Sequence, residues 1–220
     1  MNVIKPFRFH SKAELETIAA KLRSQVEQSR RRRLNADSVA EGIADYLDLC
    51  IVRKSIPADR QGKIAAMIIP VKKLVYINED ISALEGGFGQ STIAHEIGHW
   101  ILHIDKQAVG EYIDRQEKGL EIEVQPFLCR SQQSAKNIEW QAEYFAGCLL
   151  MPEYKLIEAK QGRDLTNWKH LYAIADEFGV TISNLLCRLK SLGWIVKNNN
   201  SKQIYLGKKI PSLEVRRERH

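Results

Sequence analysis

His95-Glu96-Ile97-Gly98-His99 has the HExxH pattern, whose spacing is set by metal chemistry. On a helix, two histidines four residues apart project from one face, so both imidazoles can reach a single ion. The glutamate between them is placed to take a proton from a water molecule at that ion. The stretch therefore predicts a zinc-peptidase type of site on a helix. The alternative is a surface helix that is rich in polar residues.

A zinc site with two histidines needs a third protein ligand, which leaves the fourth position for water or substrate. Glu139 is the candidate, because it opens a run that reads as a helix and stops at Pro152. Glu139 and Glu143 share one helical face with two alanines, which leave room for another helix to approach. Gly98 offers the matching gap, since a mid-helix glycine costs about 1 kcal/mol relative to alanine and so needs a reason. The alternative for Glu139 is a solvated acidic edge on a core helix.

With these residues in place, the chain resembles the ImmA/IrrE family of metallopeptidases. The family pattern HExGHxxLH, followed by ExxA(N/D)xFAxxLLMP, is close to residues 95–103 and 139–152. A short helix across Ala36 to Leu49 and a β-hairpin across Ile64 to Asn78 also fit, so the resemblance covers about residues 36 to 192. It implies a zincin-like fold and an intracellular regulator that cleaves a repressor or acts in a toxin–antitoxin pair.

The chain departs from the family pattern at two places. Glu143 stands where the family usually has Asn or Asp, so its expected hydrogen bond to a ligand histidine comes from a side chain one methylene longer. The usual arginine and phenylalanine before the motif are replaced around Gly89-Gln90-Ser91. This second departure bears on how substrate is positioned more than on metal binding.

The residues themselves support a water-activating mechanism. We expect His95, His99 and Glu139 to hold the ion and Glu96 to act as general base and then as general acid. Zinc suits these ligands best, with Mn²⁺ as the alternative. We expect His103 and Glu143 to support the ligands from behind. Four side chains are candidates, by residue type alone, for stabilising the oxyanion: His103, Tyr112, Tyr144 and His170.

Other acidic and basic residues near the motif are weaker ligand candidates. His103 follows His99 too closely and lacks the glycine turn that brings a third histidine back onto the metal in metzincins. Glu121 and Glu123 alternate with apolar residues, which predicts a half-buried strand with its acids facing water. The interval from Ile104 to Asn137 is long for a loop, so we expect it to contain structure of its own that covers or lines the cleft.

Composition narrows the setting to a globular protein in a reducing compartment. The chain has 220 residues with 44% hydrophobic content, enough for a sizeable core. Its four cysteines, Cys50, Cys129, Cys148 and Cys187, form no CxxC pair, which argues against a zinc finger or a disulfide framework. No signal peptide or membrane-spanning run is evident, so we expect a cytoplasmic protein without membrane contact.

Net charge of +6 is concentrated partly in two arginine-rich runs. Arg30 to Arg33 closes a helix predicted from Ser11 onward, where cations are favoured by the helix dipole, and Arg216, Arg217 and Arg219 lie in a tail expected to be mobile. Such runs can bind nucleic acid phosphates, but they are more often solvated.

The segment from Leu165 to Leu192 has the pattern of a helix-turn-helix. Two apolar helical faces flank Gly179-Val180-Thr181, and Asn198 to Asn200 read as the tip of a wing-like hairpin. As a DNA reader, the second helix would offer Asn184, Arg188 and Lys190. The alternative, which we favour, is that this unit packs on the catalytic core or docks a partner protein.

We therefore predict an α+β protein with a zincin-like metallopeptidase core, a small antiparallel sheet and a helical, helix-turn-helix-like C-terminal unit. The predicted parts are a helical segment (1–35), the peptidase domain (36–160), the C-terminal unit (161–207) and a basic tail (208–220). The predicted function is a zinc-dependent endopeptidase acting on a regulatory protein, which the resemblance implies to be a transcriptional repressor of a mobile element or stress response, or an antitoxin-type regulator. The alternative is a non-proteolytic DNA- or protein-binding regulator whose metal site is structural or vestigial.

Overall fold

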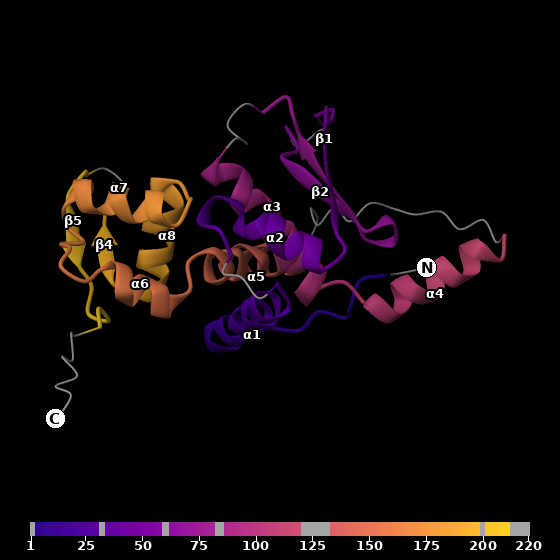
Figure 1. Cartoon of the computed structure of the whole chain (residues 1–220), viewed down its shortest axis with the longest axis horizontal. Coiled ribbons are helices and arrows are strands. Elements are labelled where there is room, and N and C mark those ends of the chain that lie inside the picture. Colours follow the sequence, from indigo (N-terminus) through magenta and orange to yellow (C-terminus); the bar gives the residue numbers. More distant parts are fainter. Residues whose placement is uncertain are drawn as a thin grey trace.

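Runs of helices and runs of strands follow one another along the chain, which gives the predicted α+β class (Figure 1). The computed structural model describes residues 3–30, 34–58, 62–81, 86–119, 133–198 and 201–211. Its α-helices are α1 (Lys12–Arg30), α2 (Val39–Tyr46), α3 (Gly87–Leu102), α4 (Lys106–Glu117), α5 (Gln133–Leu150), α6 (Glu153–Ala159), α7 (Trp168–Glu177) and α8 (Ile182–Leu192). Its strands are β1 (Cys50–Lys54), β2 (Ala66–Ile69), β3 (Leu74–Asn78), β4 (Ile195–Lys197) and β5 (Ile204–Leu206), and two short 3-10 turns cover Ala36–Ser38 and Pro70–Lys72.

The first sheet has the strand order β1-β3-β2. The predicted hairpin is confirmed, because β2 pairs antiparallel with β3 across the turn at Pro70–Lys72. The predicted antiparallel pairing holds for β2 and β3 but not for the whole sheet, because β1 pairs parallel with β3. Alternating apolar residues predict strands but not the order in which they pair. Here the chain crosses from β1 to the far edge of the sheet before the hairpin returns β3 to the centre.

Helices α3 and α5 cross at the centre of the molecule, with α1 packed on α5 and α2 packed on α3 (Figure 1). The core between them is made of fully buried aliphatic and aromatic side chains, among them Leu15, Ile43, Ile93, Ile97 and Phe145. Helix α1 confirms the helix that was predicted from Ser11 onward. Helix α4 lies within the predicted interval from Ile104 to Asn137 and confirms that it contains structure of its own.

The C-terminal part comprises α7, a turn, α8 and the antiparallel pair β4-β5. Gly179 makes the turn with a φ of +60°, and a Cβ there would lie 2.6 Å from the carbonyl oxygen of Ala36. The apolar faces predicted for the two helices are buried, including Leu171, Ile174, Leu185 and Leu189. They join the same hydrophobic cluster as α1, α3 and α5. The C-terminal helices therefore pack on the rest of the fold.

Several predictions fall outside the described residues: the strand with Glu121 and Glu123, Cys129, Arg31 to Arg33, the tip residues Asn199 and Asn200, and the tail from residue 212 onward. Within the described ranges, no helix is both long enough and apolar enough to cross a membrane.

Candidate metal centre

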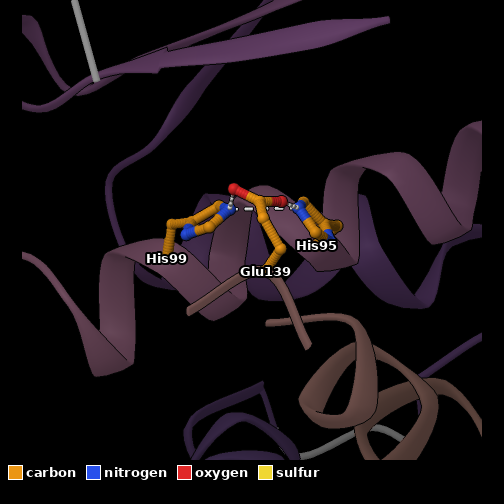
Figure 2. Close-up of side chains that lie close together, drawn as sticks. All are labelled: His95, His99 and Glu139. Atoms are coloured by element: carbon orange, nitrogen blue, oxygen red, sulfur yellow. Dashed lines mark hydrogen bonds and ion pairs between the residues drawn. The ribbon is translucent and has the colours of Figure 1, made fainter. Parts of the chain in front are cut away.

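Figure 2 shows three predicted ligands from two helices converging on one point. His95 and His99 project from α3 and Glu139 from α5, and one potential ligand atom of each lies within 4.8 Å of the others. Glu139 Oε2 lies 3.0 Å from His95 Nε2, and Glu139 Oε1 lies 3.6 Å from His99 Nε2. Two imidazole nitrogens and a carboxylate oxygen are a donor set that suits zinc and leaves a coordination position open. The residues present therefore fit the metal that the sequence predicts.

The close approach of α3 and α5 makes this convergence possible. A Cβ added at Gly98 would lie 3.0 Å from both the Cα and the carbonyl oxygen of Ala142. Gly98 lies one residue before His99, and Ala142 lies three residues after Glu139 on its helix. The absence of a side chain at Gly98 thus sets the distance between the helices that carry the ligands. This confirms the reason predicted for a glycine in mid-helix.

The charges of the three side chains are mutually dependent. Burial alone would raise the pKa of Glu139, but its interactions with His95 and His99 outweigh burial and lower the pKa to about 2. Burial would lower the pKa of His95, but the bond to Glu139 and the nearby charges of Glu96 and Glu139 raise it. The site thus holds an ionised carboxylate that attracts positive charge, which a dication can supply.

Glu96 lies on α3 between the two histidines and lines the same cavity. It is 7% exposed, and burial raises the pKa of its carboxyl group while the charges of His99 and His95 oppose the rise. A carboxylate with a raised pKa next to a metal site is suited to accept a proton and to return it.

His103 lies behind His99, where it was expected to support the ligands. His99 Nδ1 is 3.1 Å from His103 Nδ1, and His103 Nε2 is 3.4 Å from Gln141 Oε1. Gln141 in turn donates from Nε2 to the carbonyl oxygen of Arg8 over 3.1 Å. Burial, followed by the charge of His99, lowers the pKa of His103 to about 4, so this imidazole is neutral at physiological pH.

The neutral His103 sets the direction of this hydrogen-bond chain. His103 Nε2 donates to the amide oxygen of Gln141, so its Nδ1 accepts from the N–H at His99 Nδ1. The lone pair of His99 is then left at Nε2, the atom that faces Glu139. Gln141 was missed from the sequence, because it lies on a different face of α5 from the ligand Glu139.

Glu143 lies one helical turn after Glu139 and is exposed on the cavity wall. Within the described part of the chain, no hydrogen bond joins it to His95 or His99, although its charge contributes to the raised pKa of His95. Its expected hydrogen bond to a ligand histidine remains a prediction.

The four oxyanion candidates occupy different places. Of these four, Tyr144 is among the described residues that line the cavity. Its hydroxyl donates to Glu16 Oε1 over 3.1 Å. His103 lies behind His99. His170 accepts a hydrogen bond from the backbone N–H of Asp164, and Tyr112 is buried on α4. None of these positions establishes an oxyanion donor.

The ligands open into a cavity of about 740 Å³. Its walls come from α3, α5, the segment before β2 and, unexpectedly, α8. Lining residues on these walls include Phe88, Thr92, Lys63, Trp140, Asn184, Cys187 and Ser191. The α8 wall was missed, because nothing local in the sequence places residues 184–191 beside a motif at residues 95–99.

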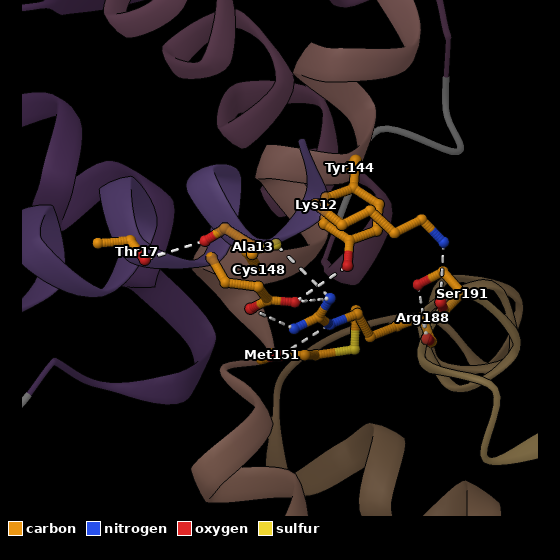
Figure 3. A network of polar contacts seen from close by, with 9 residues as sticks. Lys12, Ala13, Thr17, Tyr144, Cys148, Met151, Arg188 and Ser191 are labelled. Carbon is orange, nitrogen blue, oxygen red and sulfur yellow. Dashed lines mark hydrogen bonds and ion pairs between the residues drawn. The ribbon is translucent and has the colours of Figure 1, made fainter. Parts of the chain in front are cut away.

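Arg188, which the sequence offered as a DNA contact, is 3% exposed. Its guanidinium donates to both carboxylate oxygens of Glu16, over 2.7 and 2.8 Å, and its Nε donates to the carbonyl oxygen of Met151 over 3.1 Å (Figure 3). Asn184 faces the cavity, and its side-chain amide donates to the hydroxyl of Ser91. Lys190 remains exposed.

Comparison with known proteins agrees with this geometry. The family model described as the IrrE N-terminal-like domain, a peptidase M78 family, matches residues 51–190, a span that contains both motif helices and most of α8. No curated protein sequence is similar enough to count as a relative of the chain. Among solved structures, a Mycobacterium tuberculosis transcriptional regulator matches with a TM-score of 0.53 and 17% identity, over 82% of this chain and 47% of that one.

At that identity, the solved structure is evidence for the fold alone, and this chain spans about half of its length. The family match covers well over half of this chain and includes the residues that converge at the candidate metal centre. The chain therefore belongs to the IrrE N-terminal-like family of M78 peptidase domains, which points to a metallopeptidase type of role.

Proposed function

We propose that this protein is a zinc-dependent endopeptidase that hydrolyses a peptide bond in a regulatory protein, such as a transcriptional repressor or an antitoxin-type regulator. The observation that carries the proposal is the convergence of His95, His99 and Glu139 within 4.8 Å, at a cavity that also contains Glu96. A purely structural zinc site usually closes its coordination with four protein ligands and has no use for a general base. This arrangement has three ligands and a general base.

Bound zinc would polarise the scissile carbonyl and acidify a water molecule beside it. In the proposed reaction, a carboxylate oxygen of Glu96 takes a proton from the attacking water and later gives a proton to the nitrogen of the leaving amine. The raised pKa of Glu96 lets it hold that proton between the two steps. The chain from His99 through His103 to Gln141 keeps the nitrogen of His99 that faces Glu139 free of a proton.

The ligand set also suits Mn²⁺, but the order of metal affinities and the preference for tetrahedral geometry favour zinc. In this proposal residues 36–160 supply the catalytic groups, and residues 161–207 complete the cavity through α8. The proposed setting is the cytoplasm, because the cysteines form no CxxC pair and Cys50, Cys148 and Cys187 are free thiols.

A regulatory substrate follows from the resemblance to the ImmA/IrrE metallopeptidases. The structural neighbour from Mycobacterium tuberculosis is itself a transcriptional regulator, which is in keeping with a regulatory setting. The competing proposal is a DNA-binding regulator without proteolytic activity. The burial of Arg188 against Glu16 and the position of Asn184 at the cavity favour the peptidase, since two of the three candidate DNA contacts are already engaged.

Metal content and cleavage test the proposal together. We expect the wild-type protein to hold about one zinc ion and the variants His99→Ala and Glu139→Ala to lose it, while His170→Ala retains it as a matched histidine control. Chelation should stop cleavage of repressors encoded beside this gene, and added zinc should restore it. The metal site is wrong if both ligand variants keep their zinc. The peptidase is wrong if the zinc-loaded protein cleaves none of these repressors.

A further inference from the structure

We propose that α8 forms a substrate-binding wall, so that the peptide to be cleaved lies between the metal centre and one face of this helix. The wall consists of Asn184, Cys187 and Ser191, and its ligand is the main chain of an extended peptide segment on one side of the scissile bond. This inference rests on the proposed endopeptidase function and deepens it.

The first observation is geometric. Asn184, Cys187 and Ser191 follow a spacing of three and four residues, which places them on one face of α8 together with Arg188. All four line the same cavity as His95, Glu96, His99 and Glu139. A peptide whose scissile bond reaches the metal centre therefore has α8 as part of its surroundings. The helix that would have read DNA has this polar face turned toward the candidate active site.

The second observation is the chemistry of the wall. Its contact groups are an amide, a thiol and a hydroxyl, which are polar but uncharged. One side-chain N–H of Asn184 donates to Ser91, and the hydroxyl of Ser191 donates to the carbonyl oxygen of Arg188 over 2.8 Å. The oxygens of both side chains retain lone pairs that can accept from the N–H groups of a peptide. Such a wall suits the peptide main chain, which carries these groups whatever its sequence.

The third observation is that α8 is fixed in place. Arg188 is held by Glu16 of α1 and by the carbonyl oxygen of Met151, and Lys12 donates to the carbonyl oxygen of Ser191 over 3.0 Å (Figure 3). At the other end of the helix, a Cβ on Gly87 would lie 2.7 Å from the backbone carbon of Val180. The start of α3, which carries the motif, thus touches the turn before α8. A wall held at both ends can position substrate without having to order itself first.

Cys187 allows the wall to be labelled chemically, because its thiol is exposed and lines the cavity, whereas Cys148 is buried. Cys50 is an exposed thiol on β1 that is not among the lining residues described, which makes it the matched control. Two forms of the protein are prepared, and both carry Cys129→Ser. One form adds Cys50→Ser and leaves Cys187 to react, and the other adds Cys187→Ser and leaves Cys50. Each form is labelled with a bulky maleimide and compared with its own unlabelled sample.

Three quantities are measured: zinc content, cleavage of a fluorescence-quenched mixture of random decapeptides, and binding of the fluorescein-labelled mixture by the same forms carrying Glu96→Gln. We expect the label on Cys187 to weaken binding and to lower kcat/KM by at least about tenfold while zinc stays bound. The label on Cys50 should change none of the three. A label-free pair, Cys187→Trp beside Lys169→Trp at an exposed position of α7 that is not among the lining residues described, should reproduce the difference.

The proposal is overturned if the label on Cys187 leaves binding and cleavage unchanged, if it acts by displacing zinc, or if the unlabelled Glu96→Gln forms bind no peptide. Failure of the proposed function looks different. In that case unlabelled protein with Glu96 intact binds the peptides without cleaving them, and loss of binding on Cys187 labelling still supports the wall.

Discussion

Glu96 and the three ligand side chains are coupled through charge, and this coupling controls what each can do. An ionised Glu139 raises the pKa of His95 against the effect of burial, and burial raises the pKa of Glu96, which lines the same cavity. A dication at the ligands would balance the charge of Glu139. A change of charge on a metal ligand therefore changes the pKa of the general base, and the reverse also holds.

The raised pKa of Glu96 has a consequence for the pH dependence of activity. A general base works as a carboxylate, so activity is present above its pKa and is lost as the pH falls through it. Because burial raises this pKa from the ordinary value of 4.5, we expect kcat/KM to begin falling at a pH above 4.5. A pH profile of kcat/KM checks this. A profile that stays flat down to pH 4.5 would contradict the assignment of Glu96 as the buried base.

At the scale of elements, the site depends on the crossing of α3 and α5, which brings the ligands together. The close approach of the two helices depends in turn on the absence of a side chain at Gly98. Gly98→Ala would place a Cβ 3.0 Å from backbone atoms of Ala142, so the helices must shift. We expect it to cost about 1 to 3 kcal/mol of unfolding free energy and to weaken zinc binding. Gly110→Ala on α4, where an added Cβ has no described neighbour within 4 Å, should be neutral or stabilise by up to about 1 kcal/mol. Chemical denaturation and zinc titration of both variants check this, and equal effects would remove the crossing argument.

How much of this was predictable depends on how local each feature is. The helices α3 and α5 and the ligands on them followed from spacing alone, because the i, i+4 geometry and the glycine are properties of single helices. The hairpin of β2 and β3 was equally local. The parallel pairing of β1, the support from Gln141 and the α8 wall were not predictable in this way. Each depends on which distant segments meet, and no periodicity within a segment carries that information.

At the scale of the whole molecule, one buried ion pair joins residues 172 positions apart. Arg188 of α8 and Glu16 of α1 meet beneath the cavity, where Tyr144 of α5 also bonds to Glu16. The N-terminal helix, the motif helices and the C-terminal helices thus belong to one packed structure with a shared hydrophobic core. The C-terminal unit cannot be removed without exposing part of this core.

Breaking this pair should cost far more than breaking a pair on the surface. Glu16→Gln leaves the buried guanidinium of Arg188 without its counter-charge, and we expect a loss of about 3 kcal/mol or more of unfolding free energy. Glu177→Gln breaks the pair with Arg163, where the side chain of Glu177 is 47% exposed, and should cost no more than about 1 kcal/mol. Denaturant unfolding of both variants measures the difference. Equal losses would show that α8 is not anchored through Arg188.

The central claim is that this fold carries out hydrolysis through Glu96 at a zinc ion held by α3 and α5. The most direct measurement compares zinc-loaded wild type with Glu96→Gln, which keeps the shape of the side chain but cannot accept the proton. Zinc content, thermal stability and the rate at which each cleaves the same repressor or peptide mixture are determined side by side. We expect equal zinc content, a folded variant and a loss of cleavage of at least about a hundredfold. Cleavage by the variant at the wild-type rate would contradict the claim.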